Sequence, residues 1–256
     1  LLIGAIVGSW ATDNRLTNTR TEIRDRESVW LPGGSFDAEK TYSLGRNLYI
    51  YSGSSLKLKF PAVNDNAHTI SSVLTLQEGG TLYGGVGWAD DQGGGANMAN
   101  INFINGITIE ATAAADDIAL IYLSSGQRGL LTSKLNGSGT IKLERVGGIS
   151  YGGSMVPESS LVITGADDDA TRRFSGKIQL TGVDGEKKTH LILNHQLAAE
   201  KALISLQGAF SGLSLGVSES TIAGLESVLT GAEHITVGIT SGSTLTDSAL
   251  TINYSG

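Results

Sequence analysis

Short stretches in which apolar and polar residues alternate recur along almost the whole chain. Leu48–Ile50, Leu56–Phe60 and Val73–Leu76 are early examples, and Ile178–Leu180 is a later one. Alternation of this kind is typical of β-strands with one buried face, because successive side chains point to opposite sides. Most of these stretches are only a few residues long and are separated by turn-forming pairs such as Asn105-Gly106. The sequence therefore predicts an all-β protein with many short strands and tight turns.

Composition excludes the main alternatives to a β-fold. The 256 residues include 35 Gly, and so many glycines would destabilise a helical bundle. Only 3 Pro are present and no Gly-X-Y period occurs, which excludes collagen. A hydrophobic fraction of 40% is too high for a disordered Gly/Ser linker. The lack of Cys excludes a disulfide scaffold, a zinc–thiolate site and a cysteine nucleophile.

Many short strands at near-even spacing are typical of a sandwich, a barrel or a β-solenoid. Strands with one or two inward apolar residues fit one side of a solenoid rung, which buries its apolar face by stacking on its neighbours. We therefore predict a parallel β-helix, with a β-sandwich or jelly roll as the alternative. Gly84–Asn100 has no strand pattern and is predicted to be a long loop or a rung with an insertion, whereas Leu197–Leu203 is predicted to form one or two helical turns.

Charge and hydropathy restrict the partners. Residues 61–169 are the acidic part of a chain whose net charge is −7, and nucleic-acid binding requires a basic surface instead. No apolar run has the roughly 18–20 residues of a membrane helix, and Leu1–Val7 is too short to span a bilayer. We predict no nucleic-acid partner and no membrane span. We expect residues 1–256 to be one domain, a fragment of a secreted or longer chain.

The second half contains a recognisable succession of motifs. Gly137–Leu143 (GSGTIKL), Ser160–Gly165 (SLVITG), Phe174–Leu180 (FSGKIQL) and Thr221–Leu225 (TIAGL) follow one another. This succession resembles the autotransporter-associated β-strand repeats of bacterial surface proteins, over roughly residues 128–252. The resemblance implies a right-handed parallel β-helix (solenoid) that a Gram-negative bacterium secretes or displays on its outer surface. It also divides the chain into a regular repeat part, 128–256, and an irregular N-terminal part, 1–127.

A search for catalytic chemistry gives few candidates. Pepsin-type proteases need Asp-Thr/Ser-Gly loops, and no such tripeptide occurs. β-Helical glycosidases and lyases use carboxylates that project from one sheet into a groove. For such a role Asp116, Asp117 and Glu110 are the first residues to test. The acidic turns, among them Asp167–Asp169, lack the GGxGxD calcium repeat and are interpreted as solvated, so no metal or other cofactor is predicted.

Aromatic and basic residues give the clearest binding pattern. If Leu48, Ile50, Leu56 and Leu58 point inward, the residues between them point outward. Tyrosine faces can stack on sugar rings, and lysines can reach carboxylate or sulfate groups. The residues predicted to bind a ligand are Tyr49, Tyr51, Lys57, Lys59, Tyr83, Trp88 and Tyr122.

Three functions are compatible with these patterns. The first is a surface or secreted β-helix that binds host glycoprotein or polysaccharide, such as mucin. The second is a hydrolase of mucin-like substrates, either a glycosidase or an atypical aspartate-dependent protease that works at acid pH. The third is a structural passenger or spacer without a ligand.

Overall fold

The described part of the protein consists of β-strands joined by turns and short connections. The computed structural model describes residues 20–32, 41–42, 47–59, 68–84, 101–113, 117–123, 130–145, 158–181, 188–207, 211–228, 236–239 and 248–253. Within these ranges every regular element is a strand, as the alternating patterns predict. None of the described residues belongs to a helix with the length and apolarity needed to cross a membrane.

The strands form three parallel sheets. Sheet B contains, in spatial order, β1 (Glu22–Ile23), β4 (Leu48–Ile50), β7 (Leu74–Gln77), β10 (Ile107–Glu110) and β13 (Leu135–Gly137). Sheet A contains β2 (Ser28–Pro32), β5 (Ser55–Lys59), β8 (Thr81–Gly84), β11 (Ala119–Leu123), β14 (Thr140–Arg145), β16 (Lys177–Thr181), β18 (Ala199–Gln207), β20 (Glu219–Val228) and β22 (Ala249–Ile252). Sheet C contains β3 (Thr41–Tyr42), β6 (His68–Ile70), β9 (Ile101–Phe103), β12 (Leu130–Thr132), β15 (Glu158–Ile163), β17 (Lys188–Leu193), β19 (Ser211–Leu215) and β21 (Thr236–Ile239).

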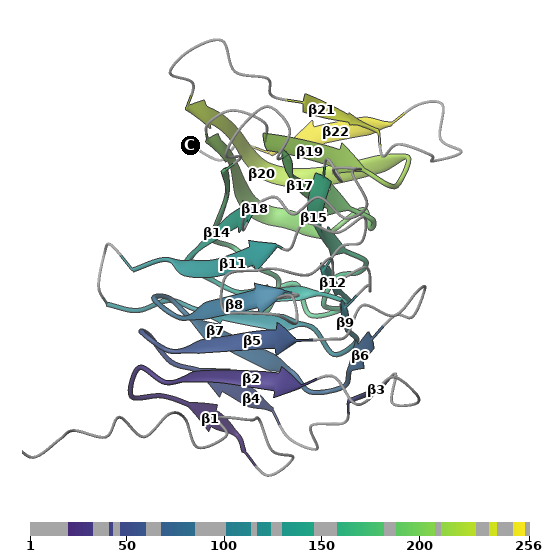
Figure 1. Ribbon diagram of the computed structural model, residues 1–256. Helices are drawn as coiled ribbons and strands as arrows, with labels where there is room; N and C mark the ends of the chain where they lie inside the picture. The colour runs from purple at the N-terminus through teal and green to yellow at the C-terminus, as the bar shows by residue number, and fades with distance from the viewer. Residues whose placement is uncertain are drawn as a thin grey trace, which may run out of the picture.

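The chain visits the sheets in a fixed order. From β1 to β15 it passes through sheets B, A and C in turn, so each strand pairs with the strand three places along the chain. From β16 onward it alternates between sheets A and C. In Figure 1 the strands accordingly stack from purple β1 and β2 at one end to yellow β22 at the other. Every ladder between the described strands is parallel, whereas a sandwich or jelly roll is built from antiparallel sheets.

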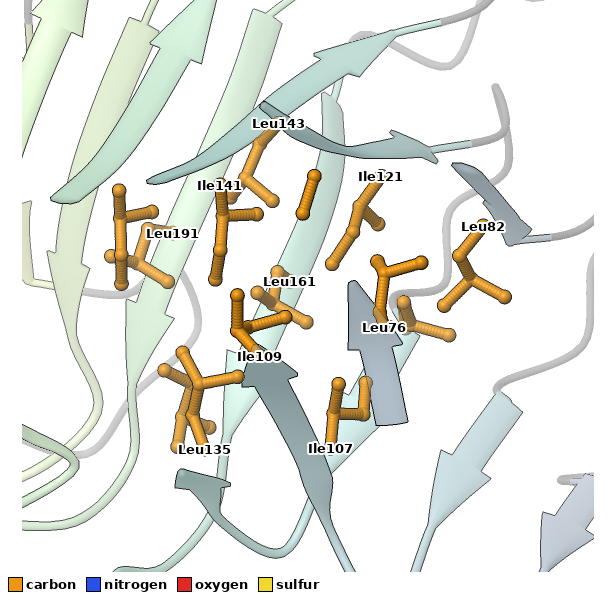
Figure 2. Close-up of a cluster of buried hydrophobic side chains, with 14 of the residues drawn as sticks. Leu76, Leu82, Ile107, Ile109, Ile121, Leu135, Ile141, Leu143, Leu161 and Leu191 are labelled. Carbon is orange, nitrogen blue, oxygen red and sulfur yellow. The ribbon is translucent and has the colours of Figure 1, made fainter. Parts of the chain in front are cut away.

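The core is a set of aliphatic columns between the sheets. The parallel register places Leu56, Leu82, Ile121, Leu143 and Leu180 in line on successive strands of sheet A, and each is at most 1% exposed. Figure 2 shows side chains of all three sheets meeting in this core, including Ile109 and Leu161. Burying a side chain of this size contributes roughly 1.5–3 kcal/mol, so the columns hold successive strands in register.

The predicted helical turns at Leu197–Leu203 are wrong. A short turn over residues 196–198 leads directly into β18, which begins at Ala199. Ala202 and Ile204 are fully buried, and β18 pairs with both β16 and β20. Helix propensity is weak for so short a segment, and strand pairing on both sides overrides it. Of the predicted loop Gly84–Asn100, Gly84 ends β8, and the remaining residues lie outside the described ranges.

Sheet B ends at β13, and the segment after β15 lies beside this last strand. Gly137 N–H donates to Arg172 O (3.0 Å) and Phe174 N–H donates to Leu135 O (3.1 Å), around an antiparallel bridge between Asn136 and Arg173. The Phe174 ring, 2% exposed, fills the core at this point. Hydrogen-bonded ladders also join strands on the two sides of residue 127, the boundary expected between the irregular and the regular part. Across it, β9 pairs with β12 and β11 pairs with β14.

Candidate functional site

Tyr49 of β4 and Tyr51, which directly follows this strand, project from the outer face of sheet B. Leu48 and Ile50 point into the core, so the intervening Tyr49 and the following Tyr51 point outward. Their ring centroids are 4.3 Å apart and the rings are tilted by 37°. The Tyr49 hydroxyl donates to a carboxylate oxygen of Glu110 on β10, and the Tyr51 hydroxyl donates to Glu22 Oε1 on β1 (3.4 Å). The tyrosines therefore reach in opposite directions across the sheet, and each ends on a carboxylate.

Gln77 on β7 completes this arrangement. Its Nε2 donates to the Tyr49 hydroxyl oxygen (3.4 Å), and its Oε1 accepts from the backbone N–H of Ser52 (3.1 Å). Because β7 lies between β4 and β10, the side chain of Tyr49 must pass over β7 to reach Glu110. We call the set Glu22, Tyr49, Tyr51, Gln77 and Glu110 the tyrosine patch.

The patch connects to a further carboxylate, that of Asp117. Ser52 Oγ donates to Asp117 Oδ2 (3.5 Å), and Thr112 Oγ1 donates to the same oxygen (3.4 Å). A chain of hydrogen bonds thus runs from Glu110 through Tyr49, Gln77 and Ser52 to Asp117. Two of the acids predicted for catalysis are linked by it to a tyrosine predicted for binding. Gln77, Ser52 and Glu22 were not identified from the sequence, because a single Gln, Ser or Glu in a strand or turn carries no motif.

The electrostatics of the patch keep Tyr49 protonated. Burial raises the pKa of its hydroxyl well above the ordinary value, and the hydrogen bond and negative charge of Glu110 raise the pKa further. The phenol therefore remains a hydrogen-bond donor throughout the physiological pH range. It holds the Glu110 side chain in one position on the sheet.

The other predicted binding residues lie on a different face. Lys57, Tyr83 and Tyr122 are directly opposite one another on adjacent strands of sheet A, whereas Tyr49 and Tyr51 belong to sheet B. The rings of Tyr83 and Tyr122 are stacked with centroids 4.8 Å apart, and Lys57 Nζ lies 5.6 Å from the Tyr83 centroid. Both faces of Tyr83 are thus used within the protein. A sugar could therefore stack on the Tyr83 ring only by displacing Lys57 or Tyr122.

Three predicted residues cannot be placed as site residues. Trp88 and Asp116 lie outside the described ranges. Lys59 is the last residue of β5, but its side chain is likewise outside what the structure describes.

A groove on the same outer face of sheet B was not predicted. It has a volume of about 810 Å³ and opens beside β10 and β13, where the segment after β15 forms its wall. Hydroxyl, amide and basic side chains dominate the lining, which includes Thr108, Lys134, Asn136, Thr171, Arg172 and Ser175.

Asp167 organises the wall of the groove. Its carboxylate, 6% exposed, accepts from Lys134 Nζ (2.8 Å), Asn136 Nδ2 (2.9 Å) and the backbone N–H of Asp169 (3.1 Å). The hydrogen bonds from Lys134 and Asn136 lower the pKa of Asp167 to about 2. The interpretation of Asp167–Asp169 as a solvated acidic turn is therefore wrong for Asp167, because internal donors occupy its oxygens.

No group of three His, Asp or Glu side chains converges as a metal site among the residues that the structure describes. In comparisons with known proteins, no family model, no curated protein and no solved structure matches the chain. The resemblance to autotransporter repeats therefore stays a prediction.

Proposed function

We propose that the chain is a right-handed parallel β-helix, secreted or displayed on the outer surface of a Gram-negative bacterium, that binds glycans through the tyrosine patch. Three parallel sheets visited in turn support the solenoid architecture. Crossover connections between parallel strands of one sheet are almost always right-handed, which supports the handedness. The repeat-like motifs in residues 128–252 support the route of export.

The observation that carries the binding proposal is the geometry of Tyr49 and Tyr51. A sugar ring has an apolar C–H face that packs on an aromatic surface and hydroxyls that need hydrogen-bond partners at its edge. The patch offers both, with two adjacent tyrosine rings whose centroids are 4.3 Å apart and the carboxylates of Glu22 and Glu110 beyond their hydroxyls. Tyr49, Glu22 and Glu110 stand on strands of a stacked sheet, and Tyr51 directly follows one, so their positions are well fixed before binding.

The patch continues along the sheet as a polar column. Register pairs Tyr49 with Thr75, Thr75 with Thr108, and Thr108 with Asn136. Neighbouring strands are about 4.8 Å apart, so the column offers a hydrogen-bonding side chain at each such interval. A surface with regularly spaced partners suits an extended polymer, and we propose polysaccharide or the glycans of a mucin-like host glycoprotein as the ligand.

Removal of the tyrosine rings tests this function. In a glycan array and a mucin pull-down, the variants Tyr49→Ala and Tyr51→Ala are expected to lose binding by about tenfold or more, because aromatic anchors dominate such contacts. The matched control is Tyr122→Ala, which removes a ring from sheet A. Unchanged binding in Tyr49→Ala and Tyr51→Ala, or an equal loss of binding in Tyr122→Ala, would contradict the proposal. Absence of binding by the unmodified protein would favour a structural passenger.

The hydrogen-bond chain from Glu110 to Asp117 favours a hydrolase as the second candidate. Glycoside hydrolysis requires two carboxyl groups about 5–10 Å apart, and these two acids flank one polar network. Incubation of the pure protein with mucin across a pH series tests this function. Product fragments that disappear in Glu110→Gln and in Asp117→Asn would support it. No fragments, or fragments that persist in both variants and in Asp116→Asn, would exclude it.

A further inference from the structure

The groove lies on the same face as the tyrosine patch and begins on β10, two strands from β4. Thr108, in the groove lining, is opposite Thr75, which is opposite Tyr49. An extended ligand that covers Tyr49 and follows the polar column therefore reaches the groove after crossing β7.

The groove presents one basic group in a fixed position. Lys134 follows β12 in the chain, and its ammonium is held 2.8 Å from the buried carboxylate of Asp167. An ammonium carries three N–H donors, and Asp167 accepts one of them. The lysine side chain is 35% exposed and forms part of the groove lining. Its position is set by a partner that stays ionised at physiological pH.

The second basic group, Arg172, lies on the wall of the groove. Its side chain is 70% exposed, and its Nε lies 3.5 Å from Asp169 Oδ2. An exposed pair at this distance holds the guanidinium weakly, which leaves most of its five N–H donors available. Asp169 in turn accepts from the backbone N–H and the hydroxyl of Thr171 through its other oxygen (2.9 and 2.7 Å).

The balance of donors and acceptors defines the ligand chemistry. The carboxylates paired with Lys134 and Arg172, those of Asp167 and Asp169, accept hydrogen bonds from within the protein. Lys134 and Arg172 retain donors, and hydroxyls such as those of Thr171 and Ser175 line the space beside them. The groove is therefore suited to a ligand that brings its own charged acceptor. A carboxylate fits best, because a guanidinium can bind it through two parallel hydrogen bonds.

We infer that this groove is a subsite for the carboxylate of an acidic sugar, within the same glycan whose neighbouring sugars lie on the tyrosine patch. The inference deepens the proposed glycan-binding function and rests on it. Lys134 and Arg172 are the residues assigned to the carboxylate, and the hydroxyls of the lining are assigned to the rest of the sugar ring.

A matched pair of ligands tests the inference by isothermal titration calorimetry. Sialyllactose and its carboxyl methyl ester contain the same sugars and differ only in the charge. The unmodified protein is expected to bind the acid about tenfold more tightly than the ester, the equivalent of 1.4 kcal/mol. Arg172→Gln is expected to remove most of this preference and to leave the affinity for the ester unchanged.

The control is Arg26→Gln, which removes the same charge from an exposed arginine in the turn between β1 and β2. Equal affinity for acid and ester, or equal loss of preference in Arg26→Gln, would overturn the groove assignment while the glycan-binding proposal stands. Displacement by inorganic phosphate as readily as by sialic acid would also overturn the assignment to a sugar. If neither acid nor ester binds, and no glycan in the array does, the proposed function itself fails.

Discussion

Asp167 is the residue on which the wall of the groove depends. Its nearly buried carboxylate joins Lys134 and Asn136, which are 33 and 31 residues away in the sequence, to the backbone of Asp169 in its own turn. We expect Asp167→Asn to lower the free energy of unfolding by about 2–3 kcal/mol, because an amide has one acceptor and would place N–H groups against N–H donors. Urea denaturation measures this loss. The control is Asp168→Asn, which changes an exposed neighbour and is expected to leave stability unchanged.

The same residue makes stability depend on pH in one direction. The pKa of Asp167 in the folded protein is about 2, below its ordinary value of 3.8. Its stabilising contribution is therefore present in full above about pH 4 and is lost as the pH falls through 2. Urea midpoints of the unmodified protein and of Asp167→Asn should converge over this interval. A constant difference between them down to pH 2 would show that the carboxylate does not act through its charge.

At the scale of the element, β13 shows why a glycine is needed where sheet B ends. Gly137 has a φ of 87°, and a Cβ at this position would lie 1.9 Å from the carbonyl oxygen of Ile109 on the neighbouring strand. We expect Gly137→Ala to cost about 2–3 kcal/mol, since the strained φ and the clash with backbone add together. The loss is measured by urea denaturation.

Gly53 provides the matched control for Gly137. Its φ is 77°, but a Cβ there would meet only the side chain of Arg26, at 3.3 Å. Gly53→Ala should therefore cost only the conformational part, about 1 kcal/mol. Similar losses in the two variants would mean that the contact with Ile109 does not restrain β13.

Elements were easier to predict from the sequence than the contacts between them. Alternation identified β4 and β5 because burial on one face of a sheet has a period of two residues. It could not show that Tyr49 and Lys57 lie on different sheets, since that depends on where the chain turns between the two strands. The helical turns expected at Leu197–Leu203 failed because pairing with β16 and β20 outweighs local propensity.

The sites themselves depend on register over long separations. Tyr49 and Glu110 are 61 residues apart, and Lys134 and Asp167 are 33 residues apart. Each pair meets because successive strands of a sheet stack at a fixed spacing, and the lengths of the intervening segments decide which residues become neighbours. The residues next to a tyrosine or an aspartate in the sequence do not show how long those intervening segments are. The pairing therefore could not be predicted from the sequence. Glu78 also meets its partners through register over long separations. Its buried carboxylate accepts hydrogen bonds from the backbone N–H groups of Thr112 and Thr140.

At the scale of the whole molecule, the core is one continuous cluster in which each strand packs on the next. In such a stack the energetic effect of a change is expected to spread to adjacent strands and to fade beyond them. Leu143 and Leu180 are direct neighbours in register, on β14 and β16. Leu56, on β5, lies four strands from Leu180, a separation of about 19 Å.

Double-mutant cycles test this view of the stack. Each of Leu56→Ala, Leu143→Ala and Leu180→Ala is expected to cost about 2–5 kcal/mol, because each opens a cavity among fully buried side chains. The pair Leu143→Ala with Leu180→Ala shares one cavity, so its loss in urea denaturation should differ from the sum of the single losses by about 0.5–3 kcal/mol. The pair Leu56→Ala with Leu180→Ala should be additive within about 0.5 kcal/mol. Coupling of equal size in both pairs would show that the molecule responds as a single rigid core and not as a stack of neighbouring strands.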